Sequence, residues 1–270
     1  MNYKRHYRNR ISEKKASQAV WKLCSELGCD YYWEGIPKLI VCPSCRRPLL
    51  IMTHAFTPSP NCFVVSFNLS RIATRLAIPY ILVTFTVNPP RIAYKVIGKG
   101  EPKSVVSVDE FFGKVYPRLL GDRCSECGRY FKHTPRKSFA ELKINLPNIS
   151  YEYDSLTFEL IHRELPPKWH SSIDIDAIIF SPDEEPFAVI EVSTYTNGNI
   201  FHPKKTCISE RFAQCLGVPF FVLYIPFSGV GNWGIVSYVS RRRLKGCPEE
   251  VAAFVRDEAK KHETMQIKSY

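Results

Sequence analysis

The chain has 270 residues, 45% of them hydrophobic, and a net charge of +11 from 37 Lys+Arg against 26 Asp+Glu. This apolar fraction excludes a largely disordered chain, and the length allows one large domain or two of ordinary size. No run approaches the roughly 20 apolar residues of a membrane span, and no apolar block of a secretory signal follows the basic start. We therefore expect a cytoplasmic protein without a membrane anchor.

The positive charge is concentrated in the first part of the chain. Residues 1–150 hold 24 Lys+Arg against 10 Asp+Glu, whereas residues 151–270 hold 13 against 16. A basic surface attracts polyanions and gains affinity by releasing their counterions, so nucleic acid is the leading candidate partner. A solvated basic face and an acidic protein partner are the alternatives.

Apolar periodicity and turn residues predict the elements of the first half. They are a helix at 11–27, strands at 38–42, 49–52 and 62–67, a short helix at 71–77 and a buried strand at 78–85. The strands at 38–42 and 49–52 flank the first cysteine pair, Cys42 and Cys45, as the two arms of a hairpin.

The second half alternates helices and strands. We predict a helix at 151–164, strands at 173–180 and 187–193, a helix at 203–216, a strand at 220–225 and a helix at 249–262. This alternation favours the α/β class, with helices packed on a mixed sheet.

Residues 208–223 echo residues 69–83. In each segment a helix turns through a small residue and a proline into a buried strand. Two copies do not establish a repeat. A duplicated unit whose first copy has lost its acidic residues and turned to binding, and the coincidence of a common helix-to-strand turn, both remain open.

Two Cys-X-X-Cys pairs have the spacing of zinc knuckles. Together Cys42, Cys45, Cys124 and Cys127 supply the four thiolates of a closed tetrahedral zinc site, which stabilises a fold and performs no chemistry. If the pairs do not meet in space, Cys24, Cys29 or His133 would complete separate sites. Buried cysteines without metal are the remaining alternative.

Acidic residues lie on two strands that we expect to pair. Strand alternation puts Asp174 and Asp176 on one face, and Glu191 stands in the middle of an apolar run. The short turn at 181–186 makes the strands hairpin neighbours, so that Asp176 and Glu191 face one another. Two carboxylates suit Mg²⁺, which takes oxygen ligands and keeps several waters. An exposed strand edge with an inert Glu191–lysine ion pair is the alternative.

Asp176, the hairpin and Glu191-Val192-Ser193 resemble the signature of the PD-(D/E)XK nuclease superfamily, over about residues 151–226. The resemblance implies a restriction-endonuclease-like fold, with a helix, a three-stranded meander, a helix and a further strand. It also implies metal-dependent hydrolysis of phosphodiester bonds in DNA. By the same resemblance Glu159, Asp176 and Glu191 would bind Mg²⁺ or Mn²⁺, with Asp174 in reserve.

The chain departs from the family pattern at Ser193, where the family has a lysine. Some members carry this lysine on the following helix, which makes Lys205 the candidate and Lys204 the alternate. The segment around His202 is also similar to the very-short-patch-repair-like branch of the superfamily. His202 would then be a general base or a phosphate contact, or else a solvated or capping residue.

Basic residues in two places are candidates for contacts with DNA. They are Lys4, Arg5, Arg8 and Arg10 in an N-terminal arm with interleaved aromatic residues, and Arg46, Arg47, Arg136 and Lys137 around the cysteine pairs. We thus predict a basic nucleic-acid-binding region at 1–140 and a nuclease-like domain at 141–270, acting alone, as a homodimer or in a larger nucleoprotein assembly. The alternative function is a zinc-stabilised DNA-binding or scaffold protein that keeps the nuclease fold without its activity.

Overall fold

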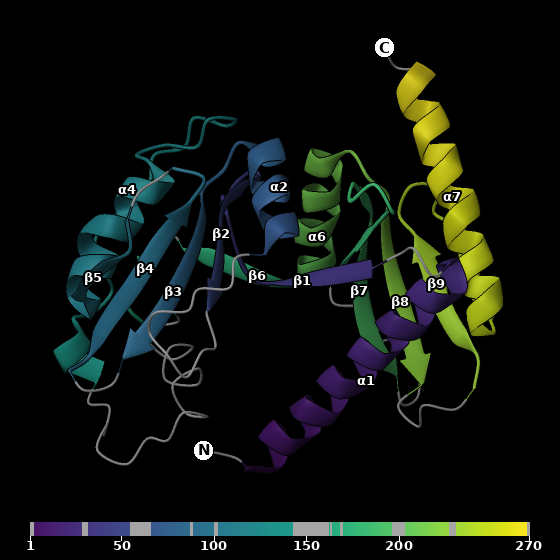
Figure 1. Ribbon diagram of the computed structural model, residues 1–270, viewed down its shortest axis with the longest axis horizontal. Coiled ribbons are helices and arrows are strands. Elements are labelled where there is room, and N and C mark those ends of the chain that lie inside the picture. Colours follow the sequence, from purple (N-terminus) through teal and green to yellow (C-terminus); the bar gives the residue numbers. More distant parts are fainter. Residues whose placement is uncertain are drawn as a thin grey trace. The chain divides into compact units, whose positions relative to one another are not determined.

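Figure 1 shows the computed structural model of the chain. The structure describes residues 3–28, 32–54, 66–86, 89–99, 102–142, 162, 164–167, 170–195, 203–226 and 231–268. Within these ranges the side chains of residues 3–13, 32–34, 36–37, 54, 195, 203–206 and 266–268 are not described.

The described residues form an α/β structure with one mixed sheet of ten strands. The strands are β1 (Tyr32–Val41), β2 (Pro48–His54), β3 (Tyr80–Thr86), β4 (Arg91–Ile97), β5 (Ser104–Ser107), β6 (Ser171–Phe180), β7 (Pro186–Tyr195), β8 (Phe220–Pro226), β9 (Trp233–Ser237) and β10 (Arg243–Gly246). Their order in the sheet is β10-β9-β8-β7-β6-β1-β2-β3-β4-β5.

The helices are of very different lengths. They are α1 (Tyr3–Leu27), α2 (Phe67–Leu76), α3 (Val108–Glu110), the π-helical turn η1 (Phe111–Val115), α4 (Tyr116–Leu120), the 3₁₀ turn η2 (Phe139–Leu142), α6 (Pro203–Leu216) and α7 (Pro248–Lys268). In the described ranges, no helix combines the length and the apolar composition that a membrane crossing requires.

Contacts divide the chain into two compact units. Unit 1 comprises residues 1–35 and 174–270, and unit 2 comprises residues 36–173. The helix α1 therefore belongs with the C-terminal elements by its contacts. The division of the chain into a binding region at 1–140 and a nuclease-like domain at 141–270 remains a prediction about function.

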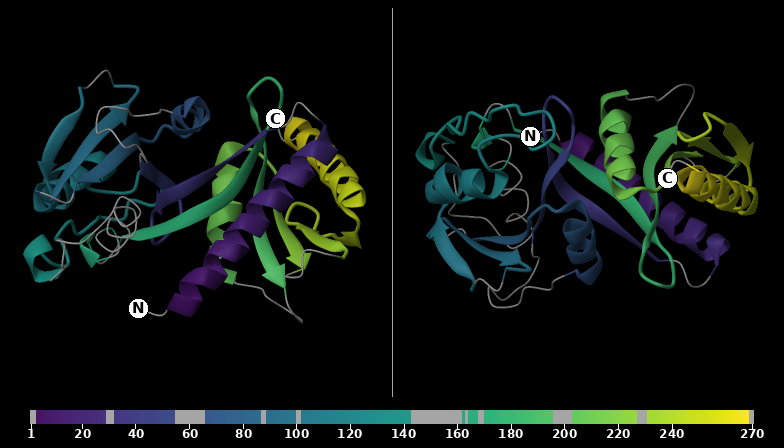
Figure 2. Two further views of the ribbon diagram at one scale, coloured as in Figure 1. Left: turned by 60° about the horizontal axis from the view of Figure 1, so that its bottom comes forward. Right: turned by 90° about the horizontal axis from the view of Figure 1, so that it is seen from above.

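Unit 1 has helices on both faces of its strands. The helices α1 and α7 cover one face and α6 covers the other, as Figures 1 and 2 show. Alternate residues of β6, β7 and β8, among them Ala177, Ile190 and Phe221, pack in one core with apolar residues of α1 and α7. The next residue along each strand therefore points toward α6.

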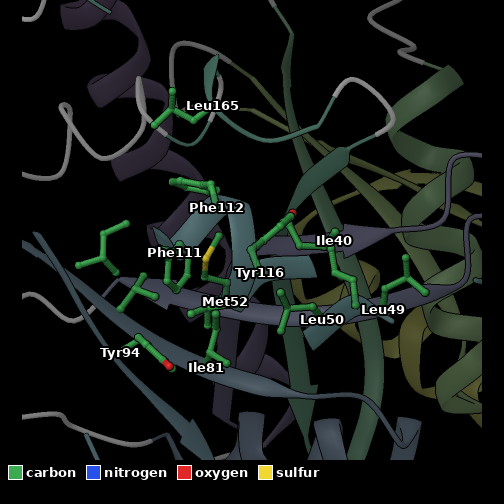
Figure 3. Close-up of a cluster of buried hydrophobic side chains, with 14 of the residues drawn as sticks. Ile40, Leu49, Leu50, Met52, Ile81, Tyr94, Phe111, Phe112, Tyr116 and Leu165 are labelled. Atoms are coloured by element: carbon green, nitrogen blue, oxygen red, sulfur yellow. The ribbon is translucent and has the colours of Figure 1, made fainter. Parts of the chain in front are cut away.

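Unit 2 is built in the same way around β2, β3 and β4. Its main core lies between these strands and the continuous helical segment formed by α3, η1 and α4, where Phe111, Phe112 and Tyr116 are fully buried. Figure 3 shows these aromatic rings against Met52 and Ile81 of the sheet. The helix α2 contacts β2 and β3 and buries its own apolar stripe.

The two units share one order of secondary-structure elements. In each, two antiparallel strands are followed by a helix, a strand parallel to the second, two further antiparallel strands and a helical segment. Both first hairpins show a register shift one residue from the turn, between Ile40 and Val41 and between Ile179 and Phe180. The helix ends also match, because Ile78 N–H donates to Ala73 O, as Val218 N–H donates to Ala213 O 140 residues later. The two segments of the sequence echo therefore occupy the same place in this order of elements.

Most predicted elements are found within a few residues of their predicted bounds. Residues 3–10 were wrongly left outside the first helix, since α1 begins at Tyr3. The strand predicted at 62–67 is wrong at its end, because Ser66 caps α2 by accepting a hydrogen bond from Leu69 N–H (3.1 Å) and Phe67 is helical. Residues 62–65 and nearly all of the predicted helix at 151–164 lie outside the described residues.

Candidate metal centres

Asp176 and Glu191 lie at corresponding places on the paired strands β6 and β7. The antiparallel ladder runs from Phe180–Pro186 to Ala177–Ile190, and Asp176 and Glu191 are the next residue on each strand. Ala177 and Ile190 face the core under α1 and α7. Because side chains alternate along a strand, both carboxylates are on the opposite face, toward α6.

Each carboxylate is oriented by a hydrogen bond within unit 1. The backbone N–H of Val192 on the neighbouring strand β7 donates a hydrogen bond to Asp176 Oδ2 (2.8 Å). The hydroxyl of Ser209 on α6 donates to Glu191 Oε1 (2.7 Å). Such second-layer donors are typical of metal-binding carboxylates, because they fix the ligand in one orientation.

Burial makes Glu191 the more constrained of the two acids. Its side chain is 4% exposed and Ser209 is fully buried, whereas Asp176 is half-buried. A carboxylate removed from water is costly unless hydrogen bonds or a cation compensate its charge. Mg²⁺ and Mn²⁺ prefer oxygen ligands, and the two oriented carboxylates that face α6 supply such oxygens.

The position of Lys205 is on the same face of α6 as Ser209. It precedes Ser209 by four residues, which is about one helical turn. The side chains of Lys204 and Lys205 are not described, so only their helical positions are known. Ser193 follows Glu191 by two residues and is half-buried on the same face of β7.

The remaining acidic and imidazole candidates are not part of this described pair. Asp174 lies two residues before Asp176 on β6 and is exposed. Glu159 and His202 lie outside the described residues.

The second unit has no carboxylate at the corresponding positions. The ladder of β1 and β2 matches that of β6 and β7 pair by pair, so that Pro37 corresponds to Asp176 and Thr53 to Glu191. The Thr53 hydroxyl is hydrogen-bonded to the Tyr80 hydroxyl (3.2 Å) instead. Of the two units, only unit 1 has an acidic pair at these ladder positions.

Unit 2 has a four-cysteine cluster. The sulfur atoms of Cys42, Cys45, Cys124 and Cys127 all lie within 4.8 Å of one another. Cys42 Sγ and Cys127 Sγ are 3.7 Å apart, and Cys45 Sγ and Cys124 Sγ are 3.5 Å apart. A tetrahedron of sulfurs about 2.3 Å from a central zinc has edges of roughly 3.8 Å. The cluster therefore fits a structural Zn²⁺ ion, and Cys24, Cys29 and His133 are not needed to complete it.

The two cysteine pairs share one turn geometry. Cys42 N–H donates to Arg47 O and Arg46 N–H to Cys42 O, both at 2.9 Å, and the same two bonds recur from Cys124 to Arg129 and from Gly128 to Cys124. The fifth residue of each turn is left-handed, with φ of 63° at Arg46 and 70° at Gly128. Glycine suits that conformation, and an arginine there is less common.

Two arginines connect the knuckles to each other. Arg129 Nη1 donates to Ser44 Oγ (2.5 Å), and Arg47 pairs with Glu126 at 3.5 Å. These contacts hold the cysteine pairs in register from outside the sulfur cluster. Among the other predicted basic contacts, Arg46 and Arg136 are exposed, and Lys137 lies 3.4 Å from Glu164.

The four thiols differ in their readiness to ionise. Burial raises the pKa of Cys45 to about 12, whereas the backbone N–H of Arg129 lowers the pKa of Cys127 to about 7. Zinc binds thiolates, so binding would have to displace protons from the buried members of the set.

The comparisons with known proteins give no relative. No family model, curated protein or solved structure matches the chain.

Two donors that orient the acidic pair, Ser209 and the Val192 amide, were not predicted from the sequence. Ser209 was the easier to find, since it follows Lys205 by one turn on the buried face of α6. The Val192 amide has no sequence signal, because any residue at that position carries the same N–H.

Proposed function

We propose that the chain is a metal-dependent endonuclease that hydrolyses phosphodiester bonds in DNA, with Asp176 and Glu191 as ligands of Mg²⁺ or Mn²⁺. The observation that carries the proposal is the pair of carboxylates at the end of the β6–β7 ladder, on the face toward α6. Each carboxylate accepts a hydrogen bond from its own donor, the Val192 amide or the Ser209 hydroxyl. A divalent cation bound there would polarise a phosphate and supply activated water.

The order of elements in unit 1 supports the nuclease family that the motif resembles. Within residues 151–226, the region of the resemblance, the described elements are β6, β7, α6 and β8 in that order. They would correspond to two strands of the meander, the second helix and the last strand expected of that family. The restriction-endonuclease-like assignment rests on this order and on the positions of Asp176 and Glu191.

The distribution of charge supports nucleic acid as the substrate. Unit 2 contains 19 Lys+Arg against 10 Asp+Glu, whereas unit 1 contains 18 against 16. The more basic unit would hold the phosphate backbone by sequence-independent attraction, and unit 1 would supply the carboxylates. A place in the cytoplasm, as a monomer, a homodimer or part of a nucleoprotein assembly, is part of the same proposal.

Lys205 would take the place of the family's lysine, which is absent because position 193 is a serine. From its position one turn before Ser209, a cationic amine would orient the attacking water and offset negative charge on the phosphate. Glu159 is the further ligand implied by the resemblance, and His202 the further base.

One observation favours a second candidate, a DNA-binding protein that has the nuclease fold but cuts nothing. Ser193 stands where the family signature has its lysine. In that case the chain would bind DNA, and Glu191 would serve only to connect β7 to α6 through Ser209.

A plasmid-nicking assay separates these candidates. Purified zinc-loaded chain is incubated with supercoiled plasmid in Mn²⁺, in Mg²⁺ and in EDTA, beside the variants Glu191→Gln, Asp176→Asn and Lys205→Ala. Asp174→Asn is the matched control, since it removes an exposed carboxylate two residues from Asp176.

The endonuclease proposal expects nicking that needs the metal and that falls at least a hundredfold in Glu191→Gln and Asp176→Asn but not in Asp174→Asn. Plasmid binding without nicking in either metal would favour the inactive DNA-binding protein. Nicking that survives in Glu191→Gln would show that the activity is not that of this site.

A further inference from the structure

We infer that the second zinc knuckle presents Tyr130 as a stacking platform for an unpaired nucleobase, so that unit 2 binds single-stranded nucleic acid. The inference rests on the nucleic-acid partner of the proposed function and concerns a surface that the acidic pair does not include.

Tyr130 is an exposed aromatic residue on a well-fixed backbone. Its side chain is 73% exposed. The backbone on either side is held by hydrogen bonds from Cys124 N–H to Arg129 O and from Phe131 N–H to Asp122 O, both at 2.9 Å. Phe131 is buried in the core of unit 2, so the alternation along the chain points Tyr130 outward.

Exposed basic residues lie next to Tyr130 along the chain, opposite it in a bridge and on the facing knuckle. Arg123 and Tyr130 form an antiparallel bridge, and residues directly opposite in such a bridge have their side chains on the same face. Arg129 and Lys132 are close to Tyr130 along the chain, and Arg46 is at the tip of the facing knuckle; all of them are exposed. We call Arg46, Arg123, Arg129, Tyr130 and Lys132 the knuckle surface.

A single exposed aromatic residue is common and needs no explanation by itself. The knuckle surface differs in combining the ring with four exposed cationic residues on two turns that meet at the four-cysteine cluster. Proteins that bind single strands use this combination, in which cations follow the phosphates and an aromatic face stacks on a base.

The geometry favours a single strand over a duplex. Bases in a duplex are stacked on one another, and an aromatic face gains a base only where the base is unpaired. Arg129 also donates to Ser44, and Arg47 pairs with Glu126, so the cationic groups nearest the sulfurs are already oriented when a strand arrives.

Other exposed aromatic residues serve as controls. Phe67 on α2 is 64% exposed and belongs to the same unit, but its ring is covered by the Arg71 guanidinium at 5.6 Å. Trp21 on α1 is 69% exposed and belongs to unit 1.

The test is fluorescence anisotropy with a labelled oligo-dT strand and with a duplex of equal length, using the full zinc-loaded chain. The protein carries Glu191→Gln and no other divalent cation is added, so that cutting plays no part. We expect Tyr130→Ala to weaken binding to oligo-dT by roughly tenfold, and Tyr130→Phe to restore most of it. Phe67→Ala and Trp21→Ala should bind like the parent chain. Zinc content and thermal unfolding of each variant report whether the knuckle is intact.

Undiminished binding of oligo-dT by Tyr130→Ala would overturn the inference. So would an equal loss toward the duplex, because the ring would then act without stacking. A chain that binds oligo-dT through Tyr130 but never nicks plasmid would leave the inference standing and remove the endonuclease. A chain that binds no nucleic acid would remove both.

Discussion

Two histidines of unit 2, His162 buried and His170 half-buried, have lowered pKa values. The His162 and His170 ring centroids lie 4.7 Å apart, and His170 Nδ1 is hydrogen-bonded to the Tyr116 hydroxyl. Burial lowers the pKa of His170 to about 3, and the positive charges of Arg136 and Lys38 add to the effect. The pKa of His162 is also well below its ordinary value, again mainly through burial.

This pair predicts that acid destabilises the protein. A histidine whose pKa is depressed in the folded state contributes its full stability above the unfolded value of about 6.5, and loses it as pH falls below that value. Below this pH the unfolded chain takes up protons and the folded chain does not. Each such group costs up to about 1.4 kcal/mol per pH unit.

Urea unfolding at pH 7.5 and at pH 5.5 measures the effect. The wild-type chain should lose stability at pH 5.5, and His170→Gln should lose less, since one of the two groups is gone. Equal losses in the two proteins would show that the pKa of His170 is not lowered in the folded chain.

Gly35 permits the close approach of β1 to β6 beside the acidic pair. A Cβ at this position would lie 3.1 Å from Asp176 O and 3.2 Å from Ile175 O, both backbone atoms. Backbone cannot move aside as a flexible side chain can, so Gly35→Ala must displace β6 where it carries Asp176.

We predict that Gly35→Ala lowers the free energy of unfolding by about 1–3 kcal/mol, which is the usual cost of overpacking. Gly113→Ala is the control, because a Cβ there meets nothing within 4 Å and the helical chain gains stiffness. Chemical denaturation of both variants gives the comparison. A Gly35→Ala protein as stable as Gly113→Ala would contradict the tight approach.

At the scale of elements, the four-cysteine cluster joins the β1–β2 turn to the segment after α4. The pairs are separated by 78 residues between Cys45 and Cys124, and Cys42 and Cys124 both belong to the main core of unit 2. An ion at the cluster would therefore stabilise the packing of the whole unit.

We predict one zinc per chain and a strong loss of stability when it is removed. Cys124→Ser should abolish stoichiometric zinc and lower the free energy of unfolding by several kcal/mol, given the roughly 10–16 kcal/mol of structural zinc binding in small domains. Cys215→Ser, at a half-buried cysteine of α6, is the control. Zinc is measured by a metallochromic assay after unfolding.

Zinc binding should also release protons at neutral pH, since Cys45 with a pKa of about 12 is protonated until the metal arrives. Full zinc occupancy in Cys124→Ser, or stability unaffected by a chelator, would contradict a structural zinc site.

The sequence predicted the elements with strong periodic signals. The strands β6, β7 and β8 and the helix α6 were placed within two residues, and α6 at its bounds, because their apolar runs are long and end at clear turn residues. The meeting of the two cysteine pairs was predicted from their spacing alone. The strands β4, β5, β9 and β10 were not predicted, since they are short or carry charged residues such as Lys95 and Lys245 on one face.

The start of α1 and its place in unit 1 depend on tertiary packing and could not be predicted from the local sequence pattern. The basic N-terminal residues form the first turns of α1, whose later residues Val20 and Leu23 pack in the core of unit 1. A chain start rich in Lys and Arg has no local signal for this. The assignment of α1 to the unit of β6 and β7 likewise depends on contacts across more than 140 residues.

In the whole molecule, two units with the same order of elements have different functional residues. Unit 1 has Asp176 and Glu191 where unit 2 has Pro37 and Thr53, and unit 2 has the cysteine cluster and the larger excess of positive charge. This division of properties is the basis for proposing one cation site per chain, with chemistry in one unit and binding in the other.

Titration of the zinc-loaded chain with Mn²⁺, followed by electron paramagnetic resonance of the free ion, tests the acidic pair most directly. We predict one bound Mn²⁺ per chain, lost in Glu191→Gln and in Asp176→Asn and retained in Asp174→Asn. Absence of bound Mn²⁺ in the wild-type chain, or unchanged binding in Glu191→Gln, would contradict it.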